Sequence, residues 1–403
     1  MLAKLHSIQY LTRVACAIVA LVAGTLLALK FLPAPFVWIL LTLGTILCRV
    51  GFVYRNATAG VIAFNFGIVA VAVSGIEASF EIARWASPVR EETFELGYHV
   101  PDPYLGSRPM PDVVETATLQ IDQELLYKVR YTIGANGLRL SPLDHGDNIV
   151  GCVFFFGGSF VYGEGVADDQ TLPYRTGVRS DGNYRVYNFG FHGHGPHQML
   201  AAMEHGLVDA AIDCAPSHIV YLAIVDHISR AAGLGKWSSF GPRYVIGDDG
   251  SLQFSGLYGN DEPTPTPLAR EIVWQARKSR IVSFVLDRNS YPGDSEVELF
   301  AAIVAQARKY AESAYSVSEF HVLLWDWPDR CSQQNEPCAA MTEWLQAAGI
   351  DVHPVTKIIP DFATAPDDFV LSPHDKHANA RAYALLADYV VNKILGTSIV
   401  PEE

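Results

Sequence analysis

Beyond residue 148 the chain alternates between short apolar runs and longer stretches with helical periodicity. The apolar runs have the length of buried strands and lie at residues 153–156, 184–188, 219–225, 320–325 and 352–359. Helix candidates follow at about 198–211, 295–314, 339–348 and 379–395. Strands that alternate with helices predict a parallel sheet covered on both faces. The sequence therefore predicts an α/β domain over residues 149–397.

The first 85 residues differ in composition from the rest of the chain. They hold six Lys/Arg and two Asp/Glu, and they contain three apolar runs, at residues 14–31, 36–54 and 59–76. The first run is long enough to cross a bilayer as a helix, whereas the second spans only if Arg49 snorkels towards the interface. We expect residues 1–85 to form a transmembrane anchor of three helices. The competing interpretation of the first run is a cleaved signal peptide.

The placement of Lys and Arg predicts how this anchor is oriented. Lys4 and Arg13 precede the first run, and Arg49 and Arg55 lie between the second and the third. Because cytoplasmic loops are rich in Lys and Arg, both regions are expected in the cytoplasm. Three spans then predict a multi-pass protein of the cell (inner) membrane with an extracytoplasmic, periplasmic head. Two spans would leave the head inside.

Two segments outside the alternating pattern have their own character. The lead-in at residues 86–148 begins with many helix breakers at 94–112, where we expect little regular structure. Alternation over 126–133, followed by the turn signal Asn136-Gly137, predicts a small β-hairpin. An insertion at about 231–287 interrupts the α/β domain, and an insertion of this length is typical of a lid or a specificity element.

The charge of the chain bears on nucleic acid binding, and the spacing of its cysteines bears on zinc binding and disulfides. Residues 86–403 hold 23 Lys/Arg and 41 Asp/Glu. This acidic excess argues against a nucleic acid partner. No two cysteines have the CxxC spacing of a zinc knuckle. Cys331 and Cys338 flank a polar loop and can form a disulfide if the head faces an oxidising compartment, although their spacing does not require it.

The first candidate for chemistry stands at the end of the first apolar run. That run stops at Gly157-Gly158-Ser159. In open α/β sheets ligands bind at the carboxyl ends of the strands, and a helix starting here would point its N–H groups at a developing anion. Ser159 is therefore the candidate nucleophile. Taken alone, glycines before a serine are more typical of a plain β–α turn.

A serine nucleophile needs a base and a group that orients the base. Asp375 and His377 stand two residues apart just before the last helix, with His374 as a competing base. In a loop, this spacing lets the carboxylate hold one ring nitrogen while the other faces outward. The simpler alternative is a loop charge beside a surface histidine, since most histidines do no chemistry.

A glycine-rich loop, YNFGFHGHGPHQ, follows the second apolar run at residues 187–198. Glycine lets the backbone approach a reacting centre, so an N–H of this loop could join that of Ser159 in an oxyanion hole. His192, His194 and His197 also allow a metal interpretation. Their spacing fits no common zinc signature, however, and no acidic residue is adjacent.

In this order, the blocks resemble those of the SGNH (GDSL-type) hydrolases, over roughly residues 126–395. GGSFVYGEGV matches the Gly-Asp-Ser block with Ser159 as nucleophile, NFGFHG matches the second block with Gly193 as oxyanion donor, and SPHDKHAN matches the last block through Asp375 and His377. YTIGANGLRLSP also resembles the strand and turn that precede the first block in membrane-anchored members. The resemblance implies a flavodoxin-like three-layer fold and a Ser-His-Asp triad.

Two positions depart from the family pattern. Gly158 stands where the family has Asp, and YLAIVDHISR lacks the asparagine of the third block. Val225 or Asp226 occupies that position, and an ionised Asp226 would oppose an oxyanion. The third donor is therefore absent or supplied by another group, such as His227.

These expectations describe a membrane-tethered, extracytoplasmic serine esterase that needs neither cofactor nor metal. The resemblance implies O-acyl esters of carbohydrates or lipids as substrates. If a sugar hydroxyl replaces water, the protein is instead an O-acyltransferase that modifies a cell-envelope polysaccharide. The altered third block leaves a catalytically weak binding or assembly subunit as a further alternative. The expected partners are the lipid bilayer and, for a transferase, a membrane protein that donates acyl groups.

Overall fold

The computed structural model describes residues 35–142, 149–234, 240–259, 279–282, 292–331 and 338–397 of the 403-residue chain. The chain divides into two compact units. The anchor unit comprises residues 1–88 and 263–289, and the head comprises residues 89–262 and 290–403. The predicted first span, at residues 14–31, lies outside the described residues.

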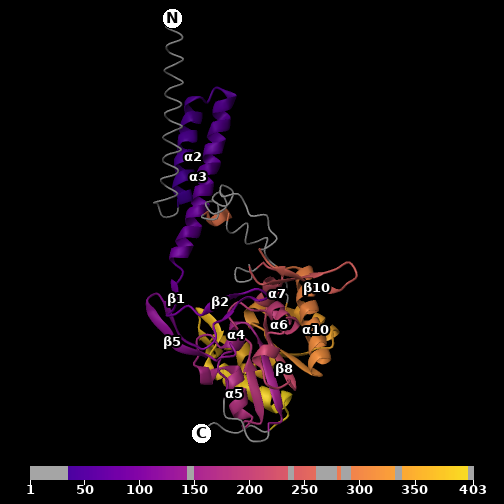
Figure 1. Cartoon of the computed structure of the whole chain (residues 1–403). Helices are drawn as coiled ribbons and strands as arrows, with labels where there is room; N and C mark the ends of the chain where they lie inside the picture. Colours follow the sequence, from indigo (N-terminus) through magenta and orange to yellow (C-terminus); the bar gives the residue numbers. More distant parts are fainter. Residues whose placement is uncertain are drawn as a thin grey trace. The chain divides into compact units, whose positions relative to one another are not determined.

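Two long apolar helices, α2 (Pro35–Val53) and α3 (Thr58–Trp85), make up most of the described anchor unit (Figure 1). They match the second and third predicted runs, and α3 continues beyond the predicted end at residue 76. Among the described residues these are the two helices that are long and apolar enough to cross a membrane. Their length and composition suggest a membrane anchor.

Glycines bring α2 and α3 together. A Cβ atom at Gly51 would lie 2.4 Å from the backbone nitrogen of Phe64, and one at Gly67 would lie 2.6 Å from that of Cys48. Lipid supplies no hydrophobic force between helices, so close packing of small residues is a main source of helix association in membranes. The hairpin therefore depends on the absence of side chains at these positions.

Two buried glutamates near the end of α3 bind a fragment of the predicted insertion at 231–287. Glu77 accepts a hydrogen bond from the Ser279 hydroxyl at 3.1 Å, and Glu81 forms an ion pair with Arg280 at 2.8 Å. Both contacts lie within the anchor unit. The insertion therefore contributes to both units, because its earlier part belongs to the head.

A five-stranded parallel sheet forms the centre of the head. Its strands are β6 (Gly151–Gly157), β7 (Tyr184–Asn188), β8 (His218–Ile224), β11 (Glu319–Trp325) and β12 (Asp351–Pro354). They lie in the order β12-β11-β8-β6-β7, and each neighbouring pair is parallel. In chain order this is the 2-1-3-4-5 arrangement of flavodoxin-like sheets. All five strands begin within two residues of a predicted apolar run.

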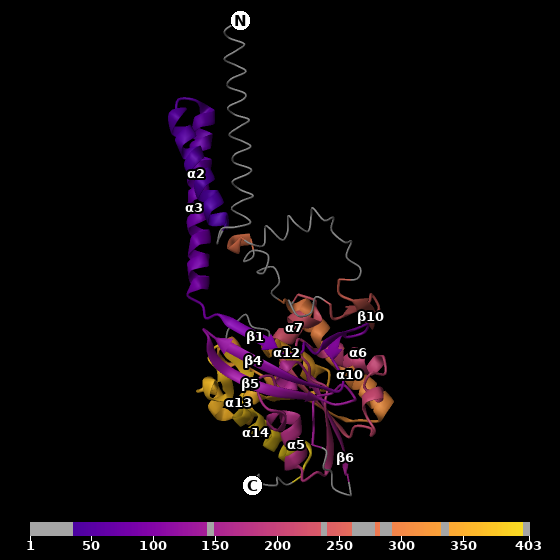
Figure 2. The ribbon, with the colours of Figure 1, turned by 60° about the vertical axis from the view of Figure 1, so that its left-hand side comes forward.

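Helices cover both faces of this sheet, so the head has three layers (Figure 2). One face carries α6 (Pro196–Glu204), α7 (Asp226–Ala231), α10 (Asp294–Tyr315) and α12 (Cys338–Ala347). The other carries α5 (Leu172–Arg179), α13 (Val355–Ile358) and α14 (Ala380–Tyr389). Along β6, Phe154 and Phe156 pack on the first face, and Val153 and Phe155 on the second. This alternation explains why the strand is apolar throughout.

The lead-in is more regular than predicted. β1 (Arg90–Phe94), β4 (Val113–Ile121) and β5 (Glu124–Ile133) form one antiparallel sheet, and β2 (His99–Asp102) pairs with β3 (Gly106–Pro109). The expectation of little structure at 94–112 is wrong, because short edge strands tolerate proline where no N–H is needed. The hairpin is β4–β5, whereas the turn at Asn136-Gly137 carries only an isolated bridge between Ile133 and Arg139.

Other elements differ from the prediction in detail. The apolar run at 352–359 is strand only as far as Pro354, and it then turns into α13. Asp326 stabilises that helix start by accepting a hydrogen bond from the N–H of Thr356 at 2.9 Å. In the described part of the insertion, β9 (Pro242–Ile246) and β10 (Leu252–Leu257) form an antiparallel hairpin.

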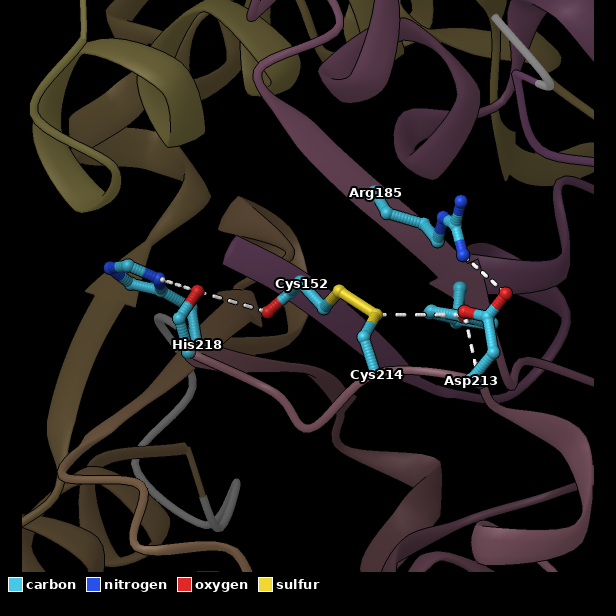
Figure 3. Close-up of a disulfide and its surroundings, with 7 residues drawn as sticks. Cys152, Arg185, Asp213, Cys214 and His218 are labelled. Carbon is cyan, nitrogen blue, oxygen red and sulfur yellow. Dashed lines mark hydrogen bonds and ion pairs between the residues drawn. A yellow bond between two sulfur atoms is a disulfide. The ribbon is translucent and has the colours of Figure 1, made fainter. Parts of the chain in front are cut away.

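Two disulfides cross-link the head. Cys331 and Cys338 are bridged, with Cα atoms 5.4 Å apart. The second bridge, which sequence reasoning missed, joins Cys152 on β6 to Cys214, with Cα atoms 6.5 Å apart. Figure 3 shows it beside Asp213, which forms an ion pair with Arg185. This bridge fixes the segment before β8 to β6.

Candidate active site

Ser159 begins a single helical turn at the carboxyl end of β6. The strand ends at Gly157, and α4 comprises only Ser159–Tyr162. A Cβ atom at Gly157 would lie 3.0 Å from the carbonyl oxygen of Leu222 and 2.7 Å from the side chain of Val161, which leaves little room for a side chain. The helix expected after Ser159 is only one turn long, because the chain leaves the helical conformation at Gly163, which has a φ of 85°. This tight turn holds Ser159 at the sheet edge.

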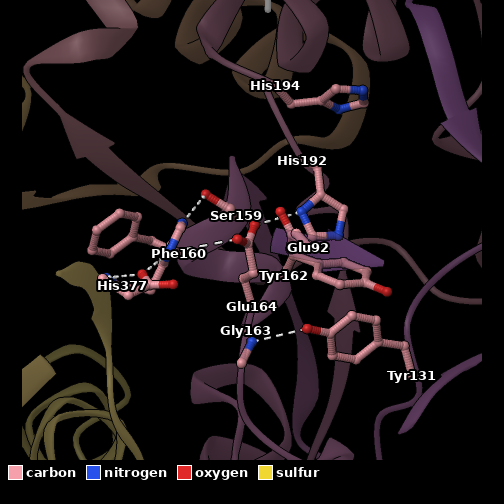
Figure 4. Close-up of polar contacts among 12 residues, drawn as sticks. Glu92, Tyr131, Ser159, Phe160, Tyr162, Gly163, Glu164, His192, His194 and His377 are labelled. Atoms are coloured by element: carbon pink, nitrogen blue, oxygen red, sulfur yellow. Dashed lines mark hydrogen bonds and ion pairs between the residues drawn. The ribbon is translucent and has the colours of Figure 1, made fainter. Parts of the chain in front are cut away.

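The structure brings together Ser159, His377 and Asp375, the three residues that the sequence selected. Figure 4 shows His377 pointing towards Ser159. The hydroxyl oxygen of Ser159 lies 2.8 Å from Nε2 of His377. The other ring nitrogen, Nδ1, lies 2.6 Å from Oδ1 of Asp375. The resulting hydrogen-bonded chain joins positions 218 residues apart. A hydroxyl, an imidazole and a carboxylate in this order can activate a nucleophile.

A short strand, rather than the expected loop, positions the imidazole and the carboxylate. Asp375 and His377 lie on β14 (Asp375–Ala378), which pairs with β13 (Val370–Ser372). Side chains two residues apart on a strand point to the same face, so both residues lie on the side of Ser159. The Ser372 hydroxyl accepts a hydrogen bond from the N–H of Asp375 at 3.0 Å. His374 is exposed.

The charges around His377 favour its protonated form. Burial by itself lowers the pKa of His377, but the carboxylates of Glu164 and Asp375 outweigh that effect, and the pKa is raised. Burial raises the pKa of Asp375, but the hydrogen bond and the charge of His377, together with the charge of Arg90, bring it below its usual value. The site can therefore stabilise an imidazolium next to an ionised Asp375.

Sequence reasoning missed a second carboxylate beside the imidazole. Glu164 Oε1 lies 3.6 Å from Nδ1 of His377, and Glu164 Oε2 lies 2.6 Å from Nδ1 of His192. Arg90, on β1, binds Asp375 at 3.0 Å and Glu164 at 3.4 Å. Burial opposes ionisation of Glu164, yet the neighbouring His377, His192 and Arg90 hold its pKa far below normal. In the sequence, the feature that could have indicated this carboxylate is the position of Glu164 between two glycines, five residues after Ser159.

Gly193 borders the same cavity as Ser159. This cavity has a volume of about 330 Å³ and is also lined by Arg90, His192, Arg230 and His377, among others. Among the described residues, neither the N–H of Ser159 nor that of Gly193 has a hydrogen-bond partner. Both are therefore available to a ligand. Asn188 links the glycine-rich loop to α4. Its side-chain amide N–H donates a hydrogen bond to the Val161 carbonyl oxygen at 3.1 Å, and its side-chain oxygen accepts one from the Gly190 N–H at 3.0 Å.

The altered third block lies mostly away from the nucleophile. Asp226 is exposed and Val225 is buried, and neither lines the cavity of Ser159. His227 was a candidate third donor, but its Nδ1 lies 2.6 Å from the hydroxyl of Tyr221 and the residue does not line that cavity either. The residue of this block that does reach the cavity is Arg230, on α7.

The three histidines of the 187–198 loop have separate surroundings. His192 binds Glu164 and the hydroxyl of Tyr98, and His194 Nε2 lies 2.9 Å from the carbonyl oxygen of Ser107. Both ring nitrogens of His197 are buried without a partner in the described structure. The three do not converge on one point. Ligand atoms of Glu164, Asp375 and His377 lie within 4.8 Å of one another, but His377 Nδ1 and Nε2 already bond to Asp375 and Ser159.

Comparison with known proteins gives similar folds at low identity. No family model matches the sequence, and neither does any curated protein. Among solved structures, a lipolytic G-D-S-L protein from Veillonella parvula DSM 2008 is 14% identical, with 60% of this chain and 98% of that chain covered and a TM-score of 0.35. An acetyl xylan esterase from Geobacillus stearothermophilus is 11% identical, with 63% and 99% covered and a TM-score of 0.36.

A third similar structure is an acetyl xylan esterase from the rumen bacterium Butyrivibrio proteoclasticus. It is 10% identical, with 77% of this chain and 88% of that chain covered and a TM-score of 0.34. The chain is thus similar to G-D-S-L lipolytic proteins and acetyl xylan esterases.

Proposed function

We propose that the head is a serine esterase that cleaves an O-acyl ester through an acyl-enzyme. The observation that carries this proposal is the hydrogen-bonded chain from Ser159 to His377 at 2.8 Å and from His377 to Asp375 at 2.6 Å. An adjacent base and a group that orients the base activate a serine hydroxyl. The cavity of about 330 Å³ at Ser159 gives a substrate access to that hydroxyl.

The proposed reaction begins with attack of the Ser159 oxygen on the ester carbonyl carbon. As the new C–O bond forms, the Ser159 proton moves to His377 Nε2 and the carbonyl π electrons move to the oxygen, which accepts hydrogen bonds from the N–H groups of Ser159 and Gly193. The oxyanion then collapses, the alkoxy C–O bond breaks, and His377 protonates the leaving oxygen. Water, deprotonated by His377, repeats these steps and releases the acid and Ser159. Asp375 keeps the ring oriented throughout.

The surroundings of the site suggest where this chemistry takes place. Disulfides persist in oxidising compartments, and the head contains Cys152–Cys214 and Cys331–Cys338. We therefore place the head outside the cytoplasm, tethered to the inner membrane by α2, α3 and the preceding apolar run. A tethered esterase meets substrates at the membrane or in the envelope, so esters of lipids or of envelope carbohydrates are the proposed substrate class.

A specific observation favours O-acyl transfer as a second candidate. A cavity of about 660 Å³ shares His192 and Gly193 with the cavity of Ser159. An acceptor hydroxyl bound there could reach the acyl-enzyme in place of water. The protein would then transfer acyl groups to an envelope polysaccharide, with a membrane protein as a source of the acyl donor.

Labelling by a fluorophosphonate probe tests the nucleophile. The full-length protein in detergent should react covalently, and Ser159→Ala should abolish the adduct. Ser251→Ala changes a half-buried serine in the turn of the β9–β10 hairpin that does not line the cavity of Ser159, and it serves as the matched control. If the folded wild-type protein is not labelled, the esterase proposal fails and a binding or assembly role is favoured.

Product analysis separates the two reactions. The protein is incubated with an acetyl ester in water, with and without an added oligosaccharide acceptor. An esterase releases free acid at the same rate in both reactions, whereas a transferase forms acylated glycan faster than free acid. Release of neither product from a labelled enzyme would exclude acetyl esters as substrates.

A further inference from the structure

Arg230 occupies the side of the site where the resemblance left a donor missing. The residue lies on α7, directly after β8, and it lines the cavity together with Ser159, Gly193 and His377. Neither Asp226 nor His227, on the same helix, reaches this cavity. Arg230 is therefore the one residue of the third block that faces the reacting centre within the described structure.

Arg230 and the carbonyl group that it binds leave no room for a side chain at position 158, where the family has Asp. A Cβ atom at Gly158 would lie 2.8 Å from Nη1 of Arg230, 2.8 Å from the carbonyl oxygen of His194 and 3.1 Å from Nε2 of His227. The φ of Gly158 is −92°, which does not require glycine. Space, rather than backbone conformation, thus excludes a side chain. The two departures from the family pattern therefore lie side by side, because the guanidinium and the His194 carbonyl that it binds occupy the space next to residue 158.

One hydrogen bond holds the guanidinium and leaves its other donors available. Nη1 donates to the carbonyl oxygen of His194 at 2.8 Å. Among the described residues, Nε and Nη2 of Arg230 have no hydrogen-bond partner. Guanidinium groups carry five N–H donors, accept no hydrogen bonds and stay charged at any working pH. Arg230 lines the cavity in which an oxyanion would develop, and it keeps these donors for a ligand there.

We propose that Arg230 is a catalytic residue that supplies the third hydrogen bond to the oxyanion, in place of the missing asparagine. The proposal rests on the esterase function proposed above. When the carbonyl π electrons move to oxygen during attack by Ser159, a guanidinium N–H donates to that oxygen together with the N–H groups of Ser159 and Gly193. Hydrogen bonds with an ionised partner are about twice as strong as neutral ones. Arg230 can thus compensate for the lost amide donor.

The test compares an ester with its thionoester analogue, in which sulfur replaces the carbonyl oxygen. Sulfur is the poorer hydrogen-bond acceptor, so a working oxyanion hole favours the oxygen ester. Loss of one such donor costs about a hundredfold or more in kcat. We expect Arg230→Ala to lower kcat for the oxygen ester by about this factor, with a much smaller effect on KM and on the thionoester. The preference for the oxygen ester should therefore collapse.

Arg108→Ala provides the matched control, since Arg108 pairs with Asp102 at 3.2 Å and lines a neighbouring cavity. It should keep the wild-type preference. Arg230→Lys should retain part of the preference, and free guanidinium should partly restore Arg230→Ala. If Arg230→Ala lowers the rates for the ester and the thionoester equally, or changes neither rate, the proposal is overturned. If Arg230→Ala does not fold, Arg230→Gln is measured in its place, and the same outcomes overturn the proposal. A wild-type protein that turns over no ester and takes no fluorophosphonate would instead overturn the esterase function itself.

Discussion

Glu164 lies 3.6 Å from Nδ1 of His377, the same nitrogen that Asp375 holds at 2.6 Å. The imidazole therefore faces two carboxylates rather than one. Glu164 is held in turn by His192 at 2.6 Å and by Arg90 at 3.4 Å. In this arrangement the second carboxylate acts on the base through charge, since it lies outside hydrogen-bond distance of the ring.

Glu164→Gln should change the pH dependence of ester hydrolysis. His377 works as a base only when neutral, so activity falls as the pH drops through its pKa. Glu164 is the main charge that raises this pKa, hence its neutralisation should move the acidic limb of kcat/KM to lower pH. The measurement is a pH–rate profile. Glu95→Gln, at an exposed glutamate, is the control, and an acidic limb that stays in place would show that Glu164 does not act on His377.

Asp375→Asn should be far more damaging than its small change in size suggests. Asparagine can present its N–H to His377 Nδ1, which favours the tautomer that cannot accept the Ser159 proton. In a serine protease the equivalent change costs about 10⁴-fold in kcat. We expect a loss of 10³- to 10⁴-fold here, from initial-rate measurements. The double variant with His377→Ala should be hardly slower than His377→Ala alone, because the residues act as a unit. Additive losses would contradict a triad.

Removal of the two disulfides should have unequal effects on stability. Cys152–Cys214 closes a loop of 62 positions and Cys331–Cys338 one of 7. Chain entropy predicts contributions of about 4 and about 2 kcal/mol to the free energy of unfolding. Chemical denaturation of the Cys152→Ala/Cys214→Ala and Cys331→Ala/Cys338→Ala double variants measures both. Equal losses would mean that loop closure does not determine the stabilisation.

A larger side chain between α2 and α3 should separate the hairpin. Gly67→Val places atoms where a Cβ already lies 2.6 Å from the backbone of Cys48, so we expect a loss of about 1–3 kcal/mol. Gly75, on the same helix, has nothing within 4 Å of its Cβ position. Gly75→Val should therefore leave the thermal stability in detergent almost unchanged. Equal melting temperatures for the two variants would show that the glycine contacts do not hold the helices together.

Sequence reasoning succeeded where local composition determines the structure. β6 is apolar throughout because both faces of the sheet are covered, and this allowed the sequence to predict the strand and the turn before Ser159. It failed where a distant partner decides. Thr356 lies in an apolar run that predicts a strand, but Asp326 accepts a hydrogen bond from its N–H and stabilises a helix start there. The Arg90–Asp375 pair likewise joins positions 285 residues apart. No local pattern marks such a partner.

The lead-in was misjudged for a related reason. Its prolines argue against helix and against a central strand, yet β2 and β3 are a two-stranded pair in which Pro101 and Pro109 are tolerated. The Cys152–Cys214 bridge was equally hidden, because it depends on how the segment before β8 passes β6. The positions of Ser159, Asp375 and His377 came instead from ordered motifs, which locate a site without describing its surroundings.

Arg90, which binds Asp375, follows Trp85, the last residue of α3, by only a few positions. A head released from its tether by proteolysis just after Arg90 could keep the five-stranded sheet, both disulfides and Ser159, and still lose Arg90. Such a fragment would fold yet hold Asp375 and Glu164 without their shared cation. A cut between Trp85 and Arg90 would instead leave Arg90 on the head. Any soluble version of this protein should therefore begin before Arg90. A cut just after Arg90 should abolish ester hydrolysis while leaving Ser159 in place.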